Sequence, residues 1–180
     1  MPTFTLMPHP TTPCEFIRAI NVQAIPVMAN ALRLRYAVSG DLRQLVVPES
    51  RRPARTDGLW RDTCFEIFLR PAQAVAYQEF NFAPSGAWAA YSFTSHRQGM
   101  KPLELAAPPR IVCRSTEQSL EVTVELQSPL LGGIGMRAAL SAVLKLRDGT
   151  VLYWALAHAA GQPDFHADTG FAATGLRIAT

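Results

Sequence analysis

Short stretches of alternating apolar and polar residues run along most of the chain. Residues 31–40 alternate leucine, tyrosine and valine with Arg33 and Arg35, and residues 120–126 alternate leucine and valine with glutamate and threonine. Side chains along a β-strand point to opposite faces with a period of two residues. Each stretch is therefore predicted to be a strand with one buried face and one wet face.

Residues 63–93 are predicted to form an antiparallel meander of three strands. The stretch CFEIFLR is followed by AYQEFNF and WAAYSF. The last two are joined by APSG, in which Pro84 and Gly86 suit a tight hairpin loop. Strands that are joined by so short a loop pair as antiparallel neighbours.

A second hairpin is predicted around Asp148 and Gly149. MRAALSAVLKL and VLYWALAH flank these residues, and Asp-Gly is a strong signal for a tight turn between two strands. The alanine-rich residues 136–146 could form a helix on propensity alone, but the turn favours a strand. Ser128 and Pro129 suit the N-cap and the first position of one short helical turn.

This pattern predicts an all-β fold with at most short helical turns. About ten short strands without an internal repeat indicate one domain over residues 1–180. Antiparallel strands in this number commonly pack as two facing sheets, so we expect a β-sandwich of jelly-roll or immunoglobulin-like type. The order of the strands does not follow from the pattern.

Composition and charge narrow the range of partners. The chain has 180 residues, with 17 Lys and Arg, 14 Asp and Glu, and a formal net charge of +3. Its local basic cluster is RRPAR at residues 51–55, which we expect to be a solvated loop because short basic runs discriminate weakly. A nucleic-acid site needs a longer basic stripe, so no nucleic-acid partner is expected.

Targeting signals and cysteines indicate an intracellular setting. The stretch MPTFTLMPHPTTP lacks the basic and apolar regions of a signal peptide, and no stretch reaches the roughly 18 apolar residues of a membrane span. We therefore expect a cytoplasmic protein without a membrane partner. Cys14, Cys64 and Cys113 have neither C-x-x-C spacing nor an even count, so they are expected to be reduced.

Glu66 is the residue that fits the strand pattern least well. Every second residue from Phe65 to Leu69 forms one apolar face, and Glu66 stands on the other face, which is itself largely apolar. A carboxylate is almost never buried unless it is paired. Glu66 is therefore expected to face solvent, to bond an arginine such as Arg70 or Arg97, or to line a ligand site.

The next strand adds polar groups that we expect to lie on the same surface. Tyr77, Glu79 and Asn81 share one face of that strand. Sugar rings pack their C–H faces on aromatic rings, and their hydroxyls form charge-assisted hydrogen bonds with carboxylates. A concave surface that suits a saccharide follows if this face lies beside Glu66. Alternatively, Glu79 and Asn81 are the exposed side of an edge strand, with Asn81 capping its own turn.

Three longer motifs resemble one known family. LWRDTCFEIFLRP, YQEFNFAPSGAWAAYSFTSHRQGM and YWALAHAAGQPDFH look like the DOMON-like domains related to family 9 carbohydrate-binding modules. The similarity extends from about Thr56 to the C-terminus. It implies a β-sandwich that binds a sugar or, in other branches, a haem. In the sugar-binding relatives two tryptophans clamp a terminal sugar unit, while a glutamate, an asparagine and an arginine bond its hydroxyls.

The candidate ligand-binding residues combine the strand pattern with this resemblance. Trp60 and Glu66 match the first clamp residue and the glutamate, and the order along the chain makes Trp154 the candidate second clamp. The family's arginine lies close after the asparagine, where this chain has Ala83, so Arg97 is the substitute candidate. The resemblance implies a non-catalytic module that binds a saccharide. The full set of candidates is Trp60, Glu66, Glu79, Asn81, Arg97 and Trp154.

A haem- or redox-binding domain of the DOMON type is the first alternative. Haem would need axial ligands from His158, His166, Met28 or Met100, and no motif brings a methionine and a histidine together. In the loop HAAGQPDFHAD, the spacing of the histidines fits no standard zinc pattern, so a structural role is expected. No metal and no cofactor are predicted.

Two further alternatives concern the same candidate residues. In an interaction domain with a lost pocket, Trp60 and Trp154 would be core residues, as tryptophans in sandwiches usually are. In a glycoside hydrolase, Glu66 and Glu79 would be a pair of carboxyls that flank the scissile bond. Relatives of the resembled type bind rather than hydrolyse, which favours binding.

Overall fold

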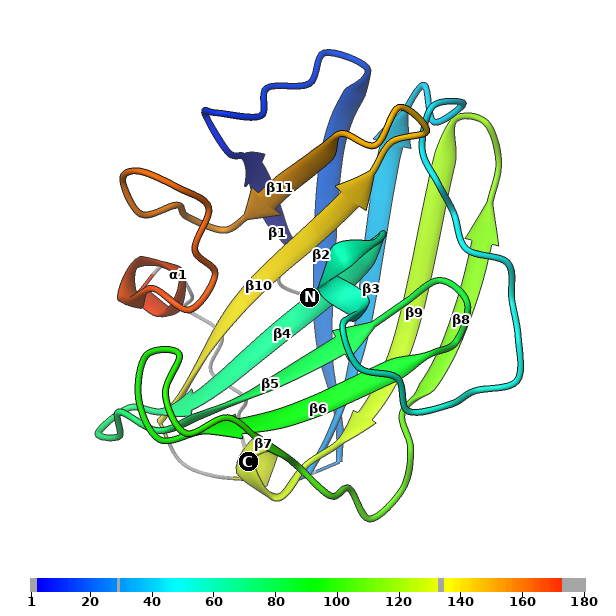
Figure 1. Cartoon of the computed structure of the whole chain (residues 1–180). Helices are drawn as coiled ribbons and strands as arrows, with labels where there is room; N and C mark the ends of the chain where they lie inside the picture. The colour runs from blue at the N-terminus through cyan, green and yellow to red at the C-terminus, as the bar shows by residue number, and fades with distance from the viewer. Residues whose placement is uncertain (1–2, 29, 133–134, 173–180) are drawn as a thin grey trace.

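The chain folds into strands that belong to one antiparallel sheet, shown in Figure 1. The computed structural model describes residues 3–28, 30–132 and 135–172. Helical structure in these residues is limited to η1 (Leu59–Arg61), η2 (Pro129–Gly132) and α1 (Asp168–Ala172). The strands are β1 (Thr3–Pro8), β2 (Ile17–Met28), β3 (Ala31–Gly40), β4 (Cys64–Pro71), β5 (Tyr77–Phe82), β6 (Trp88–Phe93), β7 (Lys101–Pro102), β8 (Arg110–Ser115), β9 (Ser119–Gln127), β10 (Met136–Lys145) and β11 (Val151–Ala155).

The sheet curls so that its two halves face each other. The strand order is β7-β6-β5-β4-β10-β11-β1-β2-β3-β9-β8. In Figure 1, β10, β4, β5 and β6 cross in front of β2, β3, β9 and β8. The main core lies between the halves, with Leu34 and Val122 from one and Phe65 and Leu140 from the other, each at most 1% exposed.

The prediction of an all-β fold is confirmed, but two separate sheets are not found. β1 pairs on one side with β2, where Leu6 lies opposite Ile20, and on the other side with β11, where Pro8 lies opposite Trp154. This strand joins the halves into a continuous half-barrel rather than a jelly-roll or immunoglobulin-like sandwich. The physical reason is that β1 makes hydrogen bonds along both of its edges.

The predicted meander and hairpins are confirmed by the strand pairing. β4, β5 and β6 are consecutive antiparallel neighbours, and β10 pairs with β11. Gly149 has a φ of +90° at the turn, and the backbone N–H of Thr150 donates to Asp148 Oδ1 at 2.8 Å. The alanine-rich segment is a strand because β4 and β11 flank it on both sides. The short helical turn predicted at Ser128 corresponds to η2.

Both faces of β4 are buried, and this positions the site described below. Its core face carries the apolar residues of the alternating pattern, whereas its other face joins a second, mainly aromatic cluster. α1 packs on β10 over this second face, where a Cβ on Gly170 would come within 3.2 Å of the Ala139 Cβ. Glycine at residue 170 therefore allows the close approach. The second cluster consists of Phe68, Tyr77, Ala89, Tyr91, Phe93, Ala139 and Phe171.

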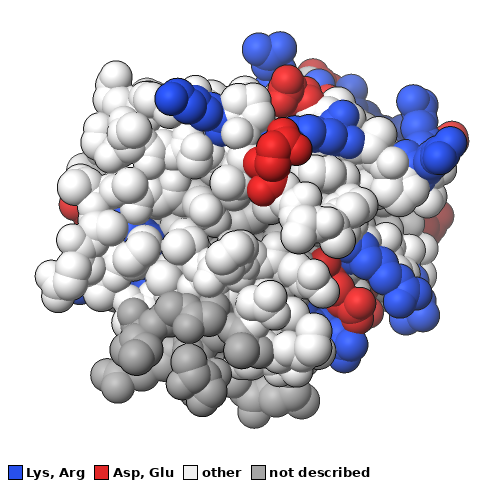
Figure 2. Space-filling view, turned by 90° about the horizontal axis from the view of Figure 1, so that it is seen from below, with Lys and Arg blue, Asp and Glu red and all other residues white. Residues whose placement is uncertain are grey.

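The surface carries charges of both signs. Figure 2 shows one face, seen from below, on which lysine and arginine lie beside aspartate and glutamate in mixed groups. Across β3 and β9, Arg33 Nη2 lies 2.8 Å from Glu125 Oε1. Among the residues that the structure describes, no helix has the length and apolar character to cross a bilayer.

One buried hydrogen bond ties the two halves together across the core. The Tyr36 hydroxyl on β3 donates to the backbone carbonyl of Glu66 on β4 at 2.7 Å. Tyr36 is fully buried, and its ring lies 5.0 Å from that of Phe65. Since the bond forms inside the core, its loss would leave a polar oxygen there without this donor.

We expect Tyr36→Phe to lower the free energy of unfolding by about 1 kcal/mol, because a buried hydrogen bond is lost while the ring is kept. Urea denaturation followed by circular dichroism measures the change. Tyr153→Phe is the matched control, since no hydrogen bond of the Tyr153 hydroxyl is found within the described part of the chain. An equal loss in both variants, or no loss in Tyr36→Phe, would contradict the role of this bond.

Candidate ligand-binding site

A cavity of about 530 Å³ lies on the face of β4, β5 and β10 that is turned away from the main core. Its floor comes from these strands. The walls come from loops and η1, and include Thr11, Thr12, Trp60, Arg97, Gln162, Pro163, Phe165 and His166. Figure 1 shows the loop after β6 and the segment before α1 on the same side of the sheet. Such a volume is typical of small-molecule sites.

Glu66 points from the centre of β4 to the cavity and is only 2% exposed. It lies opposite Ser141 on β10, whose Oγ donates to Glu66 Oε2 at 2.8 Å. Burial, and next the nearby carboxyl of Glu79, raise the pKa of Glu66 to about 8, while the bond from Ser141 and the charge of Arg97 oppose the rise. The site thus contains a carboxyl that readily holds a proton near neutral pH.

Glu79 is the second buried carboxyl of the cavity, at 5% exposed. Asn81 lies two residues further along β5, and its Nδ2 donates to Glu79 Oε1 at 2.6 Å. Burial is the main cause that raises the pKa of Glu79, and the bond from Asn81 opposes it. The exposed edge-strand alternative is wrong, because β5 pairs with both β4 and β6.

Asn81 lies beside the cavity rather than on its surface. It is fully buried opposite Glu66 and bonds Glu79, and the Cys64 thiol approaches its Oδ1 at 3.7 Å. The structure therefore brings it together with the two carboxyls, as a group that orients Glu79. It does not cap its own turn.

Trp60 lines the cavity from η1 and is 37% exposed. Its ring meets the ring of Tyr91 edge to face at 5.9 Å. The Tyr91 hydroxyl in turn donates to Asp57 Oδ1 at 2.6 Å, which ties the segment before η1 to β6. An indole that is supported in this way keeps part of its surface available to a ligand.

Trp154 is not brought to the cavity. It is 3% exposed in the main core, and its neighbour Tyr153 lines the cavity instead. The reason is the period of two along β11: Leu152 and Trp154 share the core face, and Tyr153 stands on the other. Order along the chain pointed to the tryptophan, whereas the alternation around Leu152 would have indicated the tyrosine.

Arg97 lines the cavity, but its guanidinium is bonded elsewhere. Its Nε and Nη2 donate to Asp164 Oδ1 at 3.1 and 2.9 Å, and His96 Nε2 lies 2.7 Å from Asp164 Oδ2. Arg97 has a φ of +55°, a left-handed conformation that is uncommon for a residue with a side chain. Its backbone N–H donates to the Tyr77 hydroxyl at 3.1 Å.

Neither predicted arginine forms an ion pair with Glu66. Arg70 Nη1 lies 2.5 Å from Asp168 Oδ1, and its guanidinium carbon lies 4.1 Å from the centre of the Phe171 ring. Arg97 is paired with Asp164. Of the three explanations for a carboxyl in this strand, solvent exposure and pairing with an arginine therefore fail. The position on a cavity surface remains.

His166 is a cavity residue that the sequence analysis named only for a structural loop role and as a possible axial ligand of haem. Its Nδ1 lies 2.6 Å from the Tyr77 hydroxyl, and its Nε2 lies 3.7 Å from Glu79 Oε2. The Tyr77 oxygen also accepts from the backbone N–H of Arg97, and the tautomer of the ring decides which partner donates in the bond between Tyr77 and Nδ1. Burial, and next the charge of Arg97, lower the pKa of His166 to about 4.

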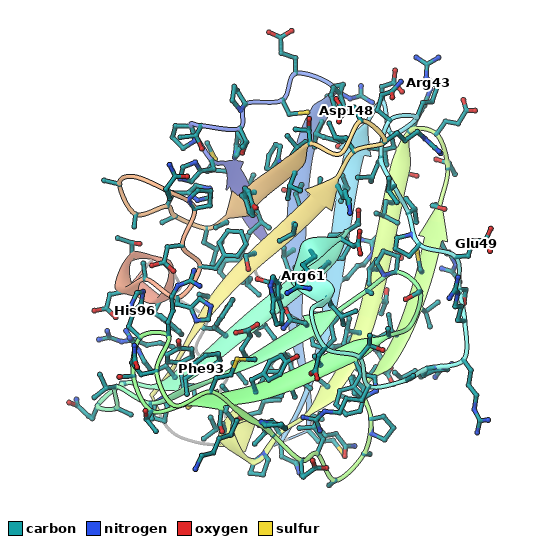
Figure 3. All side chains as sticks on the ribbon, viewed as in Figure 1. Arg43, Glu49, Arg61, Phe93, His96 and Asp148 are labelled. Atoms are coloured by element: carbon teal, nitrogen blue, oxygen red, sulfur yellow. The ribbon has the colours of Figure 1, made fainter. Side chains whose placement is uncertain are left out.

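The other residues at the cavity are mainly aromatic or small. Phe93 stacks on Tyr77 at 4.8 Å and meets His166 edge to face at 5.1 Å. Figure 3 labels Phe93 and His96, which lie near α1. The alternation along β6 could have predicted that Phe93 faces the cavity, whereas residues in loops follow no periodic pattern. The cavity residues that were not among the candidates are Thr11, Thr12, Phe68, Phe93, Met100, Val143, Tyr153, Gln162, Pro163, Phe165 and His166.

The two histidines named for haem or metal binding are engaged in other contacts. His158 Nε2 bonds the Met7 carbonyl at 2.8 Å, and both ring nitrogens of His166 face protein groups. Met28 is 57% exposed at the end of β2. Within residues 3–28, 30–132 and 135–172, no group of three or more His, Cys, Asp or Glu is arranged to hold a metal ion.

A solved structure has a similar fold. It is the crystal structure of a proposed carbohydrate-binding protein from Bacteroides uniformis ATCC 8492, with a TM-score of 0.70 and 14% sequence identity over 95% of this chain and 84% of that one. At this identity the likeness concerns the fold alone. No protein-family model and no curated protein matches the sequence. The resemblance to DOMON-like domains and family 9 modules stays a prediction.

The raised pKa of Glu66 predicts that stability falls as the pH rises. Native Glu66 keeps a proton up to about pH 8, whereas the unfolded chain releases it near 4.5, so the free energy of unfolding decreases across this interval. The lowered pKa of His166 acts in the opposite sense between about 4 and 6.5. Between pH 6.5 and 8 the pH dependence of stability is therefore expected to come from the carboxyls. In this interval the free energy of unfolding should fall by up to about 1.4 kcal/mol per pH unit.

We expect Glu66→Gln to flatten this decline, because glutamine accepts from Ser141 without titrating. Urea unfolding at a series of pH values measures the slope. Glu125→Gln, which removes an exposed carboxylate outside the cavity, should leave the slope unchanged. Identical slopes for wild type and Glu66→Gln would show that Glu66 does not carry the raised pKa.

Proposed function

We propose that the chain is a single non-catalytic module that binds the terminal unit of a saccharide in this cavity. The observation that carries the proposal is the pair of buried carboxyls, Glu66 and Glu79, on the floor of a cavity with aromatic walls. Aromatic rings suit the C–H faces of a sugar ring, and a few fixed polar groups suit its hydroxyls.

The aromatic walls supply faces for the C–H groups of a sugar. Trp60 is the partly exposed tryptophan among the described residues, and Tyr153 and Phe165 meet edge to face at 6.0 Å on the cavity surface. We assign Trp60 and Tyr153 to the stacking roles. This assignment replaces Trp154, whose burial in the core removes it from the site.

The carboxyls supply acceptors at fixed positions. Ser141 bonds one oxygen of Glu66 and Asn81 bonds one oxygen of Glu79, so each carboxyl is held in place. The second oxygen of Glu79 lies 3.7 Å from His166 Nε2, beyond hydrogen-bond distance, so the second oxygen of each carboxyl can accept from a ligand. A hydrogen bond from a sugar hydroxyl to an ionised carboxylate contributes about 1.5–3 kcal/mol net. Asn81 acts in this proposal through Glu79, and Arg97 supplies a further donor at the rim.

Other observations favour binding a saccharide over binding haem. A haem would need a free axial ligand, but His158 and His166 are engaged. The similar fold of a proposed carbohydrate-binding protein supports the same class of ligand.

Saccharide titrations followed by tryptophan fluorescence test the proposal. Trp88 and Trp154 are 8% and 3% exposed, so a ligand in the cavity should act mainly on the emission of Trp60. We expect a saturable change with a mono- or disaccharide, and Trp60→Ala should raise the Kd, measured by calorimetry, by about tenfold.

Val112→Ala is the matched control, because Val112 is an apolar residue of similar exposure, 40%, that does not line the cavity. Its Kd should equal that of the wild type. If no saccharide of a broad panel changes the emission or the melting temperature of the wild type, the proposed function is wrong. Release of reducing sugar from an oligosaccharide would instead indicate an enzyme.

A further inference from the structure

Among the residues that the structure describes, neither carboxyl of the cavity forms an ion pair with a lysine or an arginine. Glu66 Oε2 accepts from the neutral Ser141 hydroxyl, and no bond to its Oε1 is found among the described residues. Glu79 Oε1 accepts from the neutral Asn81 amide. Buried carboxylates are normally paired with a cation, because an uncompensated charge is costly to bury.

The cationic groups around the cavity are already committed. The Arg97 guanidinium bonds Asp164, which His96 also contacts, so its charge is largely balanced there. His166 faces Glu79 Oε2 at 3.7 Å, but burial lowers its pKa to about 4, so the ring is neutral near pH 7. The ionised groups on β4, β5, the loop after β6 and the loop before α1 do not balance one another. Once both carboxyls lose their protons, the floor of the cavity carries a net negative charge.

The remaining surface of the cavity also favours an organic cation. Trp60, Phe68, Phe93, Tyr153 and Phe165 line it. Aromatic faces attract cations through the negative charge above the ring. A volume of about 530 Å³ exceeds the space that a bare metal ion needs, and the described residues contain no cluster of metal ligands.

From these contacts we infer that the saccharide bound in this cavity is an amino sugar, whose ammonium group lies between Glu66 and Glu79. The ammonium donates to the carboxyl oxygens that Ser141 and Asn81 leave free, and the aromatic walls hold the ring. This inference rests on the proposed function. The raised pKa of both carboxyls fits it, because a bound cation would favour their ionised forms.

Matched sugar pairs test the inference. Glucosamine, galactosamine and mannosamine are compared by calorimetry at neutral pH with glucose, galactose and mannose, and with the N-acetylated forms that keep the ring but lose the charge. For at least one ring, we expect the free amine to bind at least tenfold more tightly than both neutral counterparts. Titration in buffers of different ionisation enthalpy should show a net release of protons on binding.

Glu66→Gln and Glu79→Gln should each remove most of the preference for the amine, while Glu125→Gln, outside the cavity, keeps it. Near-ultraviolet circular dichroism verifies that each variant is folded, and the wild-type comparison decides the question even if a variant is not. Neutral sugars that bind as tightly as their amines would overturn this inference and leave the proposed function standing. If none of these sugars binds, this inference is wrong, and the broad saccharide panel then decides the proposed function.

Discussion

The burial of two carboxyls on one face of β4 and β5 is the constraint on which this side of the molecule depends. Glu66 and Glu79 are each almost inaccessible to solvent, and such groups are tolerated only where neighbours bond their oxygens. Ser141 on β10 and Asn81 on β5 meet that need. The register of β10, β4 and β5 therefore has to hold, because a slip of one residue would turn these partners to the other face.

β4 is buried on both faces and contributes to two separate interior regions of the protein. The core face of β4 closes the main core against β3, where the Tyr36 hydroxyl bonds the carbonyl of Glu66. Its other face forms the cavity floor beside the aromatic cluster around Phe68 and Tyr77. The Tyr77 hydroxyl joins the loops to this floor, since it accepts from the N–H of Arg97 and forms a hydrogen bond with His166 Nδ1. The rigid sheet thus fixes the position of the loops that wall the cavity.

Local patterns predicted the strands, the meander and the hairpins because alternation and turn residues act over a few neighbours. They also placed Glu66, Glu79 and Asn81 on one face, as the pairing of β4 with β5 shows. The prediction for Trp154 was wrong because it rested on order along the chain instead of alternation. Local patterns also missed His166, because a loop has no period from which the direction of a side chain follows.

The sequence by itself determined the all-β class, the meander and the unusual carboxyl of Glu66, since each depends on the spacing of neighbouring residues. Only the tertiary structure decided that β1 joins both halves into one sheet and that Arg70 and Arg97 pair with Asp168 and Asp164. These contacts link residues that are far apart along the chain. Their formation depends on how the whole sheet curls, which no local pattern encodes.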